Sequence, residues 1–346
     1  MTADIENPPF VSVIMPVRNE ADFIEQSLGS VLAQNYPHDR LEIIIADGRS
    51  TDETVELIKN LKKQTAIPVL IVDNPERIAP TGLNRAIAVA KGDIIVRVDG
   101  HCEIDRDYVA NCVRHLVEKK AEGVGGPIET IGETLQAQAI AVAMSSRFGV
   151  GGSAFRTVND REMQVDTVAF PGYTREILKK AGAFNEELVR NQDDEYNYRI
   201  RKLGGRILLA PDIRSRYYSR SSFRSLWRQY FQYGYWKVRV LQLHPKQMSA
   251  RQFVPFVFVA SLISLTLLGF LWDFRPLLAL LALYGAANLL ATVKASSGIR
   301  AAGLPYLSLA YAILHFSYGL GFLSGLVAFR GKWRARPVVK TARPHF

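Results

Sequence analysis

Apolar residues follow two different patterns along the chain. In the first hundred residues, short runs rich in β-branched side chains alternate with amphipathic stretches that have helical spacing. The runs are 11–17, 41–47, 67–73 and 94–100, and the stretches include 50–64, where Ser50 or Thr51 suits a helix N-cap, and 81–93. This alternation predicts an α/β fold, and the almost continuous apolar character of the strands predicts a mostly parallel sheet with helices on both faces.

The second pattern begins near residue 250. Three runs carry no charged residue: 253–272 has 20 residues, 276–293 has 18 and 301–329 has 29. A helix needs about 20 apolar residues to cross a bilayer. The sequence therefore predicts a membrane protein, with a C-terminal α-helical membrane region over 251–330 and helices at about 253–272, 276–293 and 303–329.

Between the two patterns lies the segment "SSFRSLWRQYFQYGYWKVRVL" at 221–241. Its Trp and Tyr residues alternate with basic residues at helical spacing, which favours a helix lying in the lipid headgroup plane over an ordinary surface helix. We therefore expect a soluble domain at 1–220, an interfacial amphipathic helix and linker at 221–250, and a basic tail at 331–346.

Charge is divided unevenly along the chain, whose net charge is +10. Residues 1–205 carry 24 Lys and Arg against 31 Asp and Glu, a net charge of −7, whereas residues 206–346 carry 19 against 2, a net charge of +17. Because the basic residues accompany the apolar runs, an anionic membrane surface is the expected partner and nucleic acid is not. The acids in "MTADIENPPF" are unlike a secretory signal, so we expect a multi-pass protein of the cytoplasmic (inner) membrane with a cytosolic first half.

The tail conflicts with three membrane crossings. It carries six Lys and Arg from residue 330 onward, and the positive-inside rule predicts that such a segment stays cytosolic. Three crossings would place it on the other side. One of the three apolar runs is therefore expected to be re-entrant or to lie along the interface, and the sequence does not say which.

Polar residues stand at the carboxyl ends of the predicted strands, where open α/β sheets bind ligands. They are Arg18, Asn19 and Glu20 after the first strand, Asp47 after the second, and Asp99 and His101 after the fourth. No glycine-rich phosphate loop follows the first strand, which argues against a dinucleotide site. Asp99 and His101 can share a divalent metal that would neutralise a diphosphate, although Asp-Gly-His can also be a simple turn.

Several segments occur together in the order seen in one enzyme family. They are "VSVIMPVRNEADFIEQSLGSVLAQNYP", "IIADGRSTDET", "GLNRAIAVAKGDIIVRVDGH" and "NQDDEYNYRIRKLGG". Over about residues 10–240 the chain resembles the family-2 glycosyltransferases, especially the membrane-bound enzymes of succinoglycan-type exopolysaccharide biosynthesis. The resemblance implies a GT-A fold, a nucleotide-diphospho-sugar donor such as a UDP-hexose, a divalent metal (Mn²⁺ or Mg²⁺) and inversion at the anomeric carbon.

The resemblance also implies roles for particular residues. The nucleotide-sugar-binding positions are Pro16, Arg18, Asn19, Glu20, Asp47, Asn84, Arg85 and Asp99; the metal positions are Asp99 and His101; Arg175 lies in an acceptor-side segment. Three positions depart from the family pattern, and one of them is Gln192, which replaces the usual glutamate. Gly48 replaces a second aspartate near the base, and His101 replaces an acidic residue, which leaves the metal preference open.

An inverting transfer needs a carboxylate that takes the proton of the attacking hydroxyl. In "NQDDEYNYR" the resemblance makes Asp193 this general base, with Asp194 either contacting the acceptor or solvated. If a helix starts near Asn191, Asp193 lies in its first turn, where the helix dipole favours the ionised form. The same helix predicts a Glu195–Arg199 salt bridge and a core stripe at Tyr196, Ile200 and Leu203.

The favoured function is transfer of one sugar to a polyprenyl-diphosphate-linked saccharide, with other polysaccharide-assembly enzymes as candidate partners. A processive synthase is disfavoured because "WRQYFQYGYWK" lacks the Gln-x-x-Arg-Trp motif that such enzymes carry. A polyprenyl-phosphate sugar synthase is an alternative that differs in its acceptor. A non-catalytic membrane scaffold that binds sugar nucleotides is a third interpretation, and the presence of Asp193 argues against it.

Overall fold

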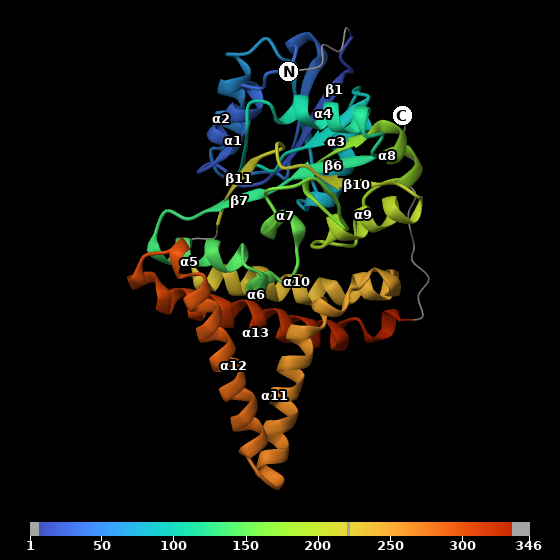
Figure 1. Ribbon diagram of the computed structural model, residues 1–346. Coiled ribbons are helices and arrows are strands. Elements are labelled where there is room, and N and C mark those ends of the chain that lie inside the picture. The colour runs from blue at the N-terminus through green and yellow to red at the C-terminus, as the bar shows by residue number, and fades with distance from the viewer. Residues whose placement is uncertain (1–6, 220–221, 334–346) are drawn as a thin grey trace. The chain divides into compact units, whose positions relative to one another are not determined.

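The computed structural model describes residues 7–219 and 222–333 (Figure 1). These residues form two compact units. The first contains residues 7–129 and 158–217, and the second contains residues 130–157 together with the described residues from 218 onward. The segment 130–157 therefore belongs with the C-terminal helices, although it lies within the N-terminal half of the chain.

The first unit is built on an eight-stranded sheet with the order β3-β2-β1-β4-β9-β6-β10-β8. Its strands are β1 (Val11–Val17), β2 (Leu41–Asp47), β3 (Val69–Asp73), β4 (Ile94–Arg97), β6 (Gly123–Gly126), β8 (Met163–Gln164), β9 (Ala169–Thr174) and β10 (Ile207–Leu209). β1 runs parallel to β2 and β4, β2 to β3, and β6 to β10, whereas β9 and β8 pair antiparallel with their neighbours. In β1 every residue except Pro16 is buried, so both faces of this strand are covered. The predicted mostly parallel α/β sheet is confirmed.

Six helices complete this unit: α1 (Ile24–Leu32), α2 (Thr54–Lys62), α3 (Ala79–Val89), α4 (Tyr108–Glu118), α8 (Arg175–Ala181) and α9 (Gln192–Lys202). The predicted N-cap of α2 was wrong. The helix is capped at Glu53, because the Ser50 hydroxyl is used by Asp47, to which it donates a 2.6 Å hydrogen bond. α3 begins two residues earlier than predicted, with Pro80 in its first turn, where proline costs no hydrogen bond.

A second, three-stranded sheet has the order β5-β11-β7, with β5 at Cys102–Ile104, β11 at Ser215–Tyr218 and β7 at Ile128–Ile131. The predicted fourth strand of the main sheet extended to residue 100, but β4 ends at Arg97. The chain turns there because the Asp99 carbonyl accepts a hydrogen bond from the backbone N–H of Cys102, the first residue of β5. The turn places Asp99 and His101 between two strands.

The described residues of the second unit are mainly helical. It contains α5 (Leu135–Met144), α6 (Arg147–Val150), α7 (Ala154–Thr157), α10 (Phe223–Leu243), α11 (Val254–Leu271), α12 (Arg275–Lys294) and α13 (Leu304–Ala328). Three of its helical segments are long and apolar enough to cross a membrane: Val254–Leu271, Arg275–Lys294 and Ala301–Ala328. They lie within a few residues of the three predicted runs. The basic tail is described only to residue 333, so most of it lies outside the described residues.

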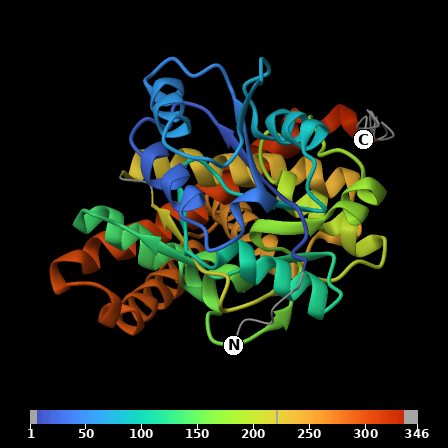
Figure 2. The same ribbon diagram turned by 90° about the horizontal axis from the view of Figure 1, so that it is seen from above.

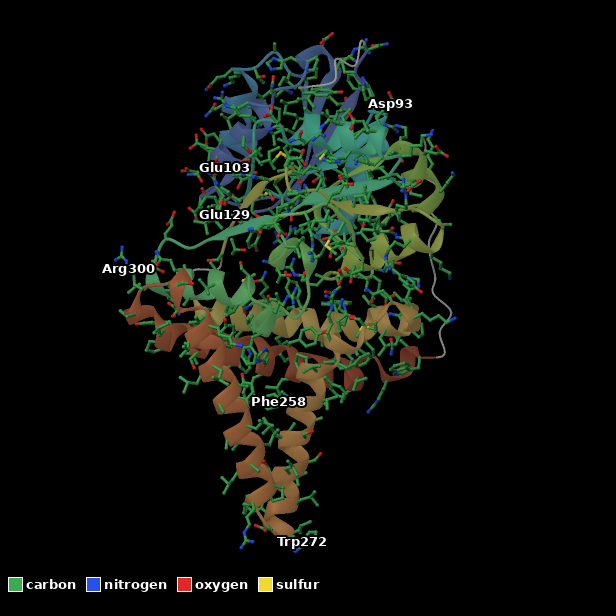
Figure 3. All side chains as sticks on the ribbon, in the orientation of Figure 1. Asp93, Glu103, Glu129, Phe258, Trp272 and Arg300 are labelled. Carbon is green, nitrogen blue, oxygen red and sulfur yellow. The ribbon has the colours of Figure 1, made fainter. Side chains whose placement is uncertain are left out.

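Within this unit, α11 and α12 form a hairpin, with Trp272 at its tip and Arg300 beyond its other end (Figure 3). α10 and α13 lie side by side and run in a different direction from the hairpin, which Figure 2 shows from a second side. The exposed large apolar side chains of the unit gather on the hairpin. They include Leu267, Phe270, Leu271 and Trp272, whose exposed fractions are 61–91%.

Candidate active site

The loops that follow β1 and β2 are tied together by hydrogen bonds. Asn19 adopts a left-handed backbone conformation with φ at 54°. Its side-chain oxygen accepts from the Thr51 N–H at 2.9 Å, and its own N–H donates to Ser50 Oγ at 3.0 Å. The Glu20 N–H donates to Thr54 Oγ1 at 2.8 Å. The predicted first loop, Arg18 to Glu20, and the predicted loop after Asp47 therefore form one edge of the site.

Asp47 ends β2 at this edge, and its carboxylate is engaged by Ser50. It accepts from Ser50 Oγ at 2.6 Å and from the Ser50 N–H at 3.2 Å. A Cβ atom on Gly48 would lie 3.1 Å from Cβ of Arg18, so the glycine lets the Arg18 side chain lie across the loop. A larger residue at position 48 would require the Arg18 side chain to shift by a few tenths of an ångström.

His101 is oriented by a carboxylate from the first loop. Its Nδ1 lies 2.9 Å from Glu20 Oε1, and both side chains are about one-fifth exposed. Gly100 permits this approach, since a Cβ there would come within 2.9 Å of Glu20 Cγ. An ionised carboxylate only accepts hydrogen bonds, so Nδ1 carries the ring proton and the lone pair of neutral His101 is on Nε2.

Asp99 and Asp193 are linked through one buried guanidinium. Arg97, at the end of β4, donates from Nε to Asp99 Oδ1 at 2.8 Å and from Nη2 to Oδ2 at 3.1 Å. Its Nη1 donates to Asp193 Oδ1, across 96 positions of sequence. The Arg97 side chain is 7% exposed, against 21% for Asp99 and 36% for Asp193. The predicted metal aspartate and the predicted base thus share one cation.

The surroundings shift the pKa of Asp193 upward. Burial is the main cause and the nearby carboxylates of Asp99 and Asp194 add to it, while Arg97 opposes it. The helix dipole in the first turn of α9 is predicted to favour the ionised form. In the structure, desolvation outweighs that effect, so this carboxylate holds a proton more strongly than an ordinary aspartate does. A raised pKa suits a group that must accept a proton during a reaction.

Helix α9, which carries Asp193, begins as predicted. Asn191 is its N-cap and adopts a left-handed conformation with φ at 62°. The predicted Glu195–Arg199 ion pair is present, with Arg199 Nε 2.8 Å from Glu195 Oε1. Tyr196 is fully buried and stacks on Phe184 with ring centroids 3.9 Å apart. These contacts fix the first turn of the helix, and with it the carboxylate of Asp193.

The predicted core stripe of α9 was right at two of its three positions. Tyr196 and Ile200 are completely buried, but Leu203 is 53% exposed. Leu203 is the C-cap residue, where the chain leaves the helix towards Gly204 with φ at 87°. The end of the helix has therefore turned this position away from the core.

Three other predicted residues make contacts within the protein. The Asn84 side chain bonds to both the N–H and the carbonyl of Phe184, at 2.7 and 2.9 Å. Arg85 forms an exposed ion pair with Glu76, at 2.9 Å. Arg175 donates to the carbonyl oxygens of Ala90 and Gly92, at 2.7 and 2.6 Å. Their binding to nucleotide or acceptor stays a prediction, as it does for Asp194.

Sequence reasoning missed Arg97, the residue that connects the site. The signal was present, because "IIVRVD" places a single cation in a strand that is otherwise apolar. A buried charge needs a partner. Two carboxylates were available, but nothing in the local sequence indicates that one of them comes from α9.

Comparison with known proteins identifies the family. Residues 12–182 match the family model described as glycosyl transferase family 2. The succinoglycan biosynthesis protein ExoA of Rhizobium meliloti is 30% identical over 325 residues, which cover 92% of this chain and 95% of the relative. This chain belongs to glycosyltransferase family 2.

Two further likenesses extend the comparison. This family-2 glycosyltransferase is 29% identical to a dolichyl N-acetyl-α-D-glucosaminyl phosphate 3-β-D-2,3-diacetamido-2,3-dideoxy-β-D-glucuronosyltransferase of Methanococcus voltae, over 92% of this chain and 97% of the relative. Its fold is similar to that of a mannosyltransferase from Pyrobaculum calidifontis solved with GDP-Man and Mn²⁺. The TM-score is 0.60 at 21% identity, covering 92% of this chain and 88% of the other. The predicted GT-A fold is confirmed.

The donor atoms at the turn after β4 fit a divalent metal. In the family-2 glycosyltransferase, Asp99 offers carboxylate oxygens and His101 offers Nε2, while Glu20 holds the other ring nitrogen, an arrangement common for metal-binding histidines. Within residues 7–219 and 222–333, no three His, Cys, Asp or Glu residues are grouped as a metal site. A metal here would therefore take its remaining ligands from phosphate oxygens and water, as Mg²⁺ often does.

Proposed function

We propose that this family-2 glycosyltransferase moves a single sugar from a nucleotide-diphospho-sugar to a lipid-linked saccharide, with inversion at the anomeric carbon. The observation that carries the proposal is the Asp99–Arg97–Asp193 linkage. One buried cation, Arg97, thus fixes the positions of two carboxylates. Asp99 is suited to the diphosphate side of the reaction, and Asp193 is suited to the acceptor side. Both lie at the carboxyl edge of the sheet, where α/β folds bind ligands.

In this mechanism Asp193 accepts the proton of the acceptor hydroxyl as the oxygen attacks the anomeric carbon. The bond from that carbon to the diphosphate oxygen breaks on the opposite face, and the nucleoside diphosphate leaves with the electron pair. The raised pKa of Asp193 increases its affinity for the proton, and the positive charge of Arg97 opposes that rise in pKa. A divalent metal at Asp99 and His101 supplies positive charge to the departing diphosphate when it is bound.

The nucleotide is proposed to lie along the joined loops after β1 and β2, near Pro16, Arg18, Asn19 and Asp47. The exposed guanidinium of Arg18 suits a polar, negatively charged ligand there. Asn84 and Arg85 on α3 complete the proposed nucleotide side, and Arg175 and Asp194 the acceptor side. The donor is proposed to be a UDP-hexose, although the solved mannosyltransferase holds GDP-Man, so the base has to be tested.

The acceptor class rests on the relatives and on the apolar helices. The relative from M. voltae is named for transfer to a sugar carried on dolichyl phosphate, and the relative from R. meliloti for succinoglycan biosynthesis. The chain carries three segments able to cross a membrane. Together these support a saccharide on a polyprenyl phosphate or diphosphate in the cytoplasmic membrane, with the catalytic unit on the cytosolic side.

The test measures release of nucleoside diphosphate by purified full-length protein in detergent. A panel of UDP- and GDP-sugars is combined with membrane lipid extract and with Mn²⁺ or Mg²⁺. We expect turnover that requires both lipid extract and metal, and that falls about 10²–10⁴-fold in Asp193→Asn with donor binding retained. The control is Glu176→Gln, which changes an exposed acid on α8 that forms an ion pair with Lys180 in the next turn of the same helix.

Two results would contradict the proposal. Equal turnover by Asp193→Asn and the wild type would mean that another group removes the proton. Donor binding without turnover for every acceptor fraction would favour the non-catalytic scaffold instead.

A further inference from the structure

The helical unit answers a question that the apolar runs leave open, namely how many of them cross the membrane. By length and composition all three candidate segments qualify. Their surroundings differ, however. In the apolar window of α11 and of α12, 11% is buried within the protein, whereas in that of α13 44% is buried. α13 is thus covered by protein to a much greater extent than α11 or α12.

The main partner of α13 is α10, and the two helices are parallel along their whole length. Near their N-terminal ends the rings of Phe223 and Tyr306 stack. In the middle, Gly234 lies against the Tyr318 carbonyl, so closely that a Cβ atom would overlap it. At the C-terminal ends Gln242 donates to the Phe329 carbonyl at 2.8 Å. Any tilt that takes α13 through a bilayer would therefore carry α10 with it.

α10 is unsuited to the interior of a bilayer. Lys237 and Arg239 are buried within the protein, but Arg224 and Arg228 are exposed, and exposed cations at membrane depth are costly. Its exposed residues include Arg224, Trp227 and Arg228. Tryptophan beside arginine is typical of helices that lie at the level of the lipid headgroups. The α10–α13 pair therefore belongs to the interface.

The hairpin meets α13 near its base. The Pro255 carbonyl and Val259 of α11 lie against Gly319, and Asn288 of α12 donates to the Ser308 carbonyl at 3.0 Å. Towards the tip the exposed fractions rise to 84% for Leu271 and 91% for Trp272. A third spanning helix would be expected to pack along the length of the hairpin, whereas α13 crosses it at one end.

The dimensions and charges of the hairpin suit two full crossings. At 1.5 Å per residue, α11 and α12 are about 27 and 30 Å long, close to the roughly 30 Å of a bilayer core. Beyond the base lie five cations: Arg251, Lys294, Arg300, Arg330 and Lys332. The tip has Asp273 and Arg275, whose charges cancel.

From these observations we infer that only α11 and α12 cross the membrane, and that α10 and α13 lie together on the anionic cytosolic leaflet. Both ends of the hairpin are then cytosolic, and the five cations at its base obey the positive-inside rule. The conflict over the basic tail disappears, because two crossings return the chain to the side from which it started. The partner of this surface is the lipid bilayer itself.

The test is cysteine labelling of the full-length protein in bacterial spheroplasts with a membrane-impermeant maleimide. Three variants place a cysteine at an exposed position: Asp273→Cys at the tip, Ser297→Cys after α12 and Gly331→Cys after α13. The wild type is the control, since Cys102 and Cys112 are both buried. We expect intact spheroplasts to label only Asp273→Cys, and permeabilised membranes to label the other two as well.

Every other pattern overturns the inference. Labelling of Gly331→Cys in intact spheroplasts would mean that α13 crosses. Protection of Asp273→Cys until permeabilisation, or in both conditions, would mean that the hairpin does not reach the far side. Labelling needs no turnover, so the result is independent of whether the sugar-transfer proposal succeeds or fails.

Discussion

At the scale of single residues, the site depends on charges that are shared between neighbours. Arg97 is buried and donates to two carboxylates, and these carboxylates raise its own pKa even though burial opposes this. The same cation lowers the pKa of Asp193, which burial and two nearby acids raise. Arg97, a residue that is not itself expected to contact the sugar, therefore limits how far burial raises the pKa of the proposed base.

Replacing Arg97 by methionine should shift the acid limb of the pH–rate profile to higher pH. The base is active only when ionised, and loss of the neighbouring cation raises its pKa further above the ordinary value of about 3.9. Arg97→Lys keeps the charge and should move the limb less. The measurement is kcat against pH for the wild type and both variants; an acid limb that stays in place in Arg97→Met would show that Arg97 does not tune the base.

Replacing Glu20 by leucine should weaken Mn²⁺ binding about 10–100-fold, because the carboxylate that fixes the His101 ring is lost. Electron paramagnetic resonance of free Mn²⁺, titrated in the presence of nucleoside diphosphate, measures this without turnover. Glu176→Gln again serves as the matched control. Unchanged affinity in Glu20→Leu would remove His101 from the proposed metal site.

At the scale of elements, the helical unit depends on close approach between α10 and α13. Gly234, Gly321 and Gly325 each bring one helix backbone against the other, and a Cβ atom at any of them would clash with backbone or side-chain atoms across the interface. Small residues at such contacts are typical of helices that pack tightly in or near membranes. Packing against α10 therefore explains why α13 is apolar, and crossing a bilayer is not needed to explain it.

The variant Gly234→Ala should destabilise the protein by about 1–3 kcal/mol, because the added methyl overlaps the Tyr318 carbonyl oxygen and the helices must separate. In Gly285→Ala, on α12, the added methyl meets no atom within 4 Å, so this control should be neutral or slightly stabilising. The melting temperature in detergent distinguishes the two. Equal shifts would contradict tight packing at Gly234.

At the scale of the whole molecule, the two units are interleaved in sequence. The segment 130–157 leaves the sheet unit, contributes α5 to α7 to the helical unit, and returns. α5 packs against α13, and most of its residues, among them Ile140 and Met144, are buried. The compact sheet unit is therefore not one continuous N-terminal segment, and the domain boundary at residue 220 stays a prediction.

A fragment ending at residue 218 should consequently be insoluble, because it retains α5 without the α13 surface that covers it. Replacing residues 130–157 by a flexible Gly/Ser linker in the same fragment should restore solubility by removing that apolar face. The readout is the soluble fraction after centrifugation. A fully soluble first fragment would mean that α5 does not need its helical partner.

The sequence by itself determined the features that repeat over a few residues. Strand and helix periods located β1, β2 and the C-terminal helices, and uncharged length marked the three candidate spans. Ligands of open α/β sheets bind at the carboxyl ends of the strands, and this rule predicted that one edge carries Glu20, Asp47, Asp99 and His101. The prediction was possible because the local pattern shows where each strand ends. The start of α9 near Asn191 and the Glu195–Arg199 ion pair also depend on local sequence, and both predictions are confirmed.

Only the tertiary structure decided the relations between distant segments. Arg97 meets Asp193 across 96 positions, and α13 packs on α10 although their sequences are about 80 residues apart. The assignment of residues 130–157 to the helical unit depends on contacts of the same kind. Hydropathy measures how apolar a segment is, and it is equally high for a helix covered by protein and for a helix covered by lipid. Which of the two applies to α13 depends on what lies beside it.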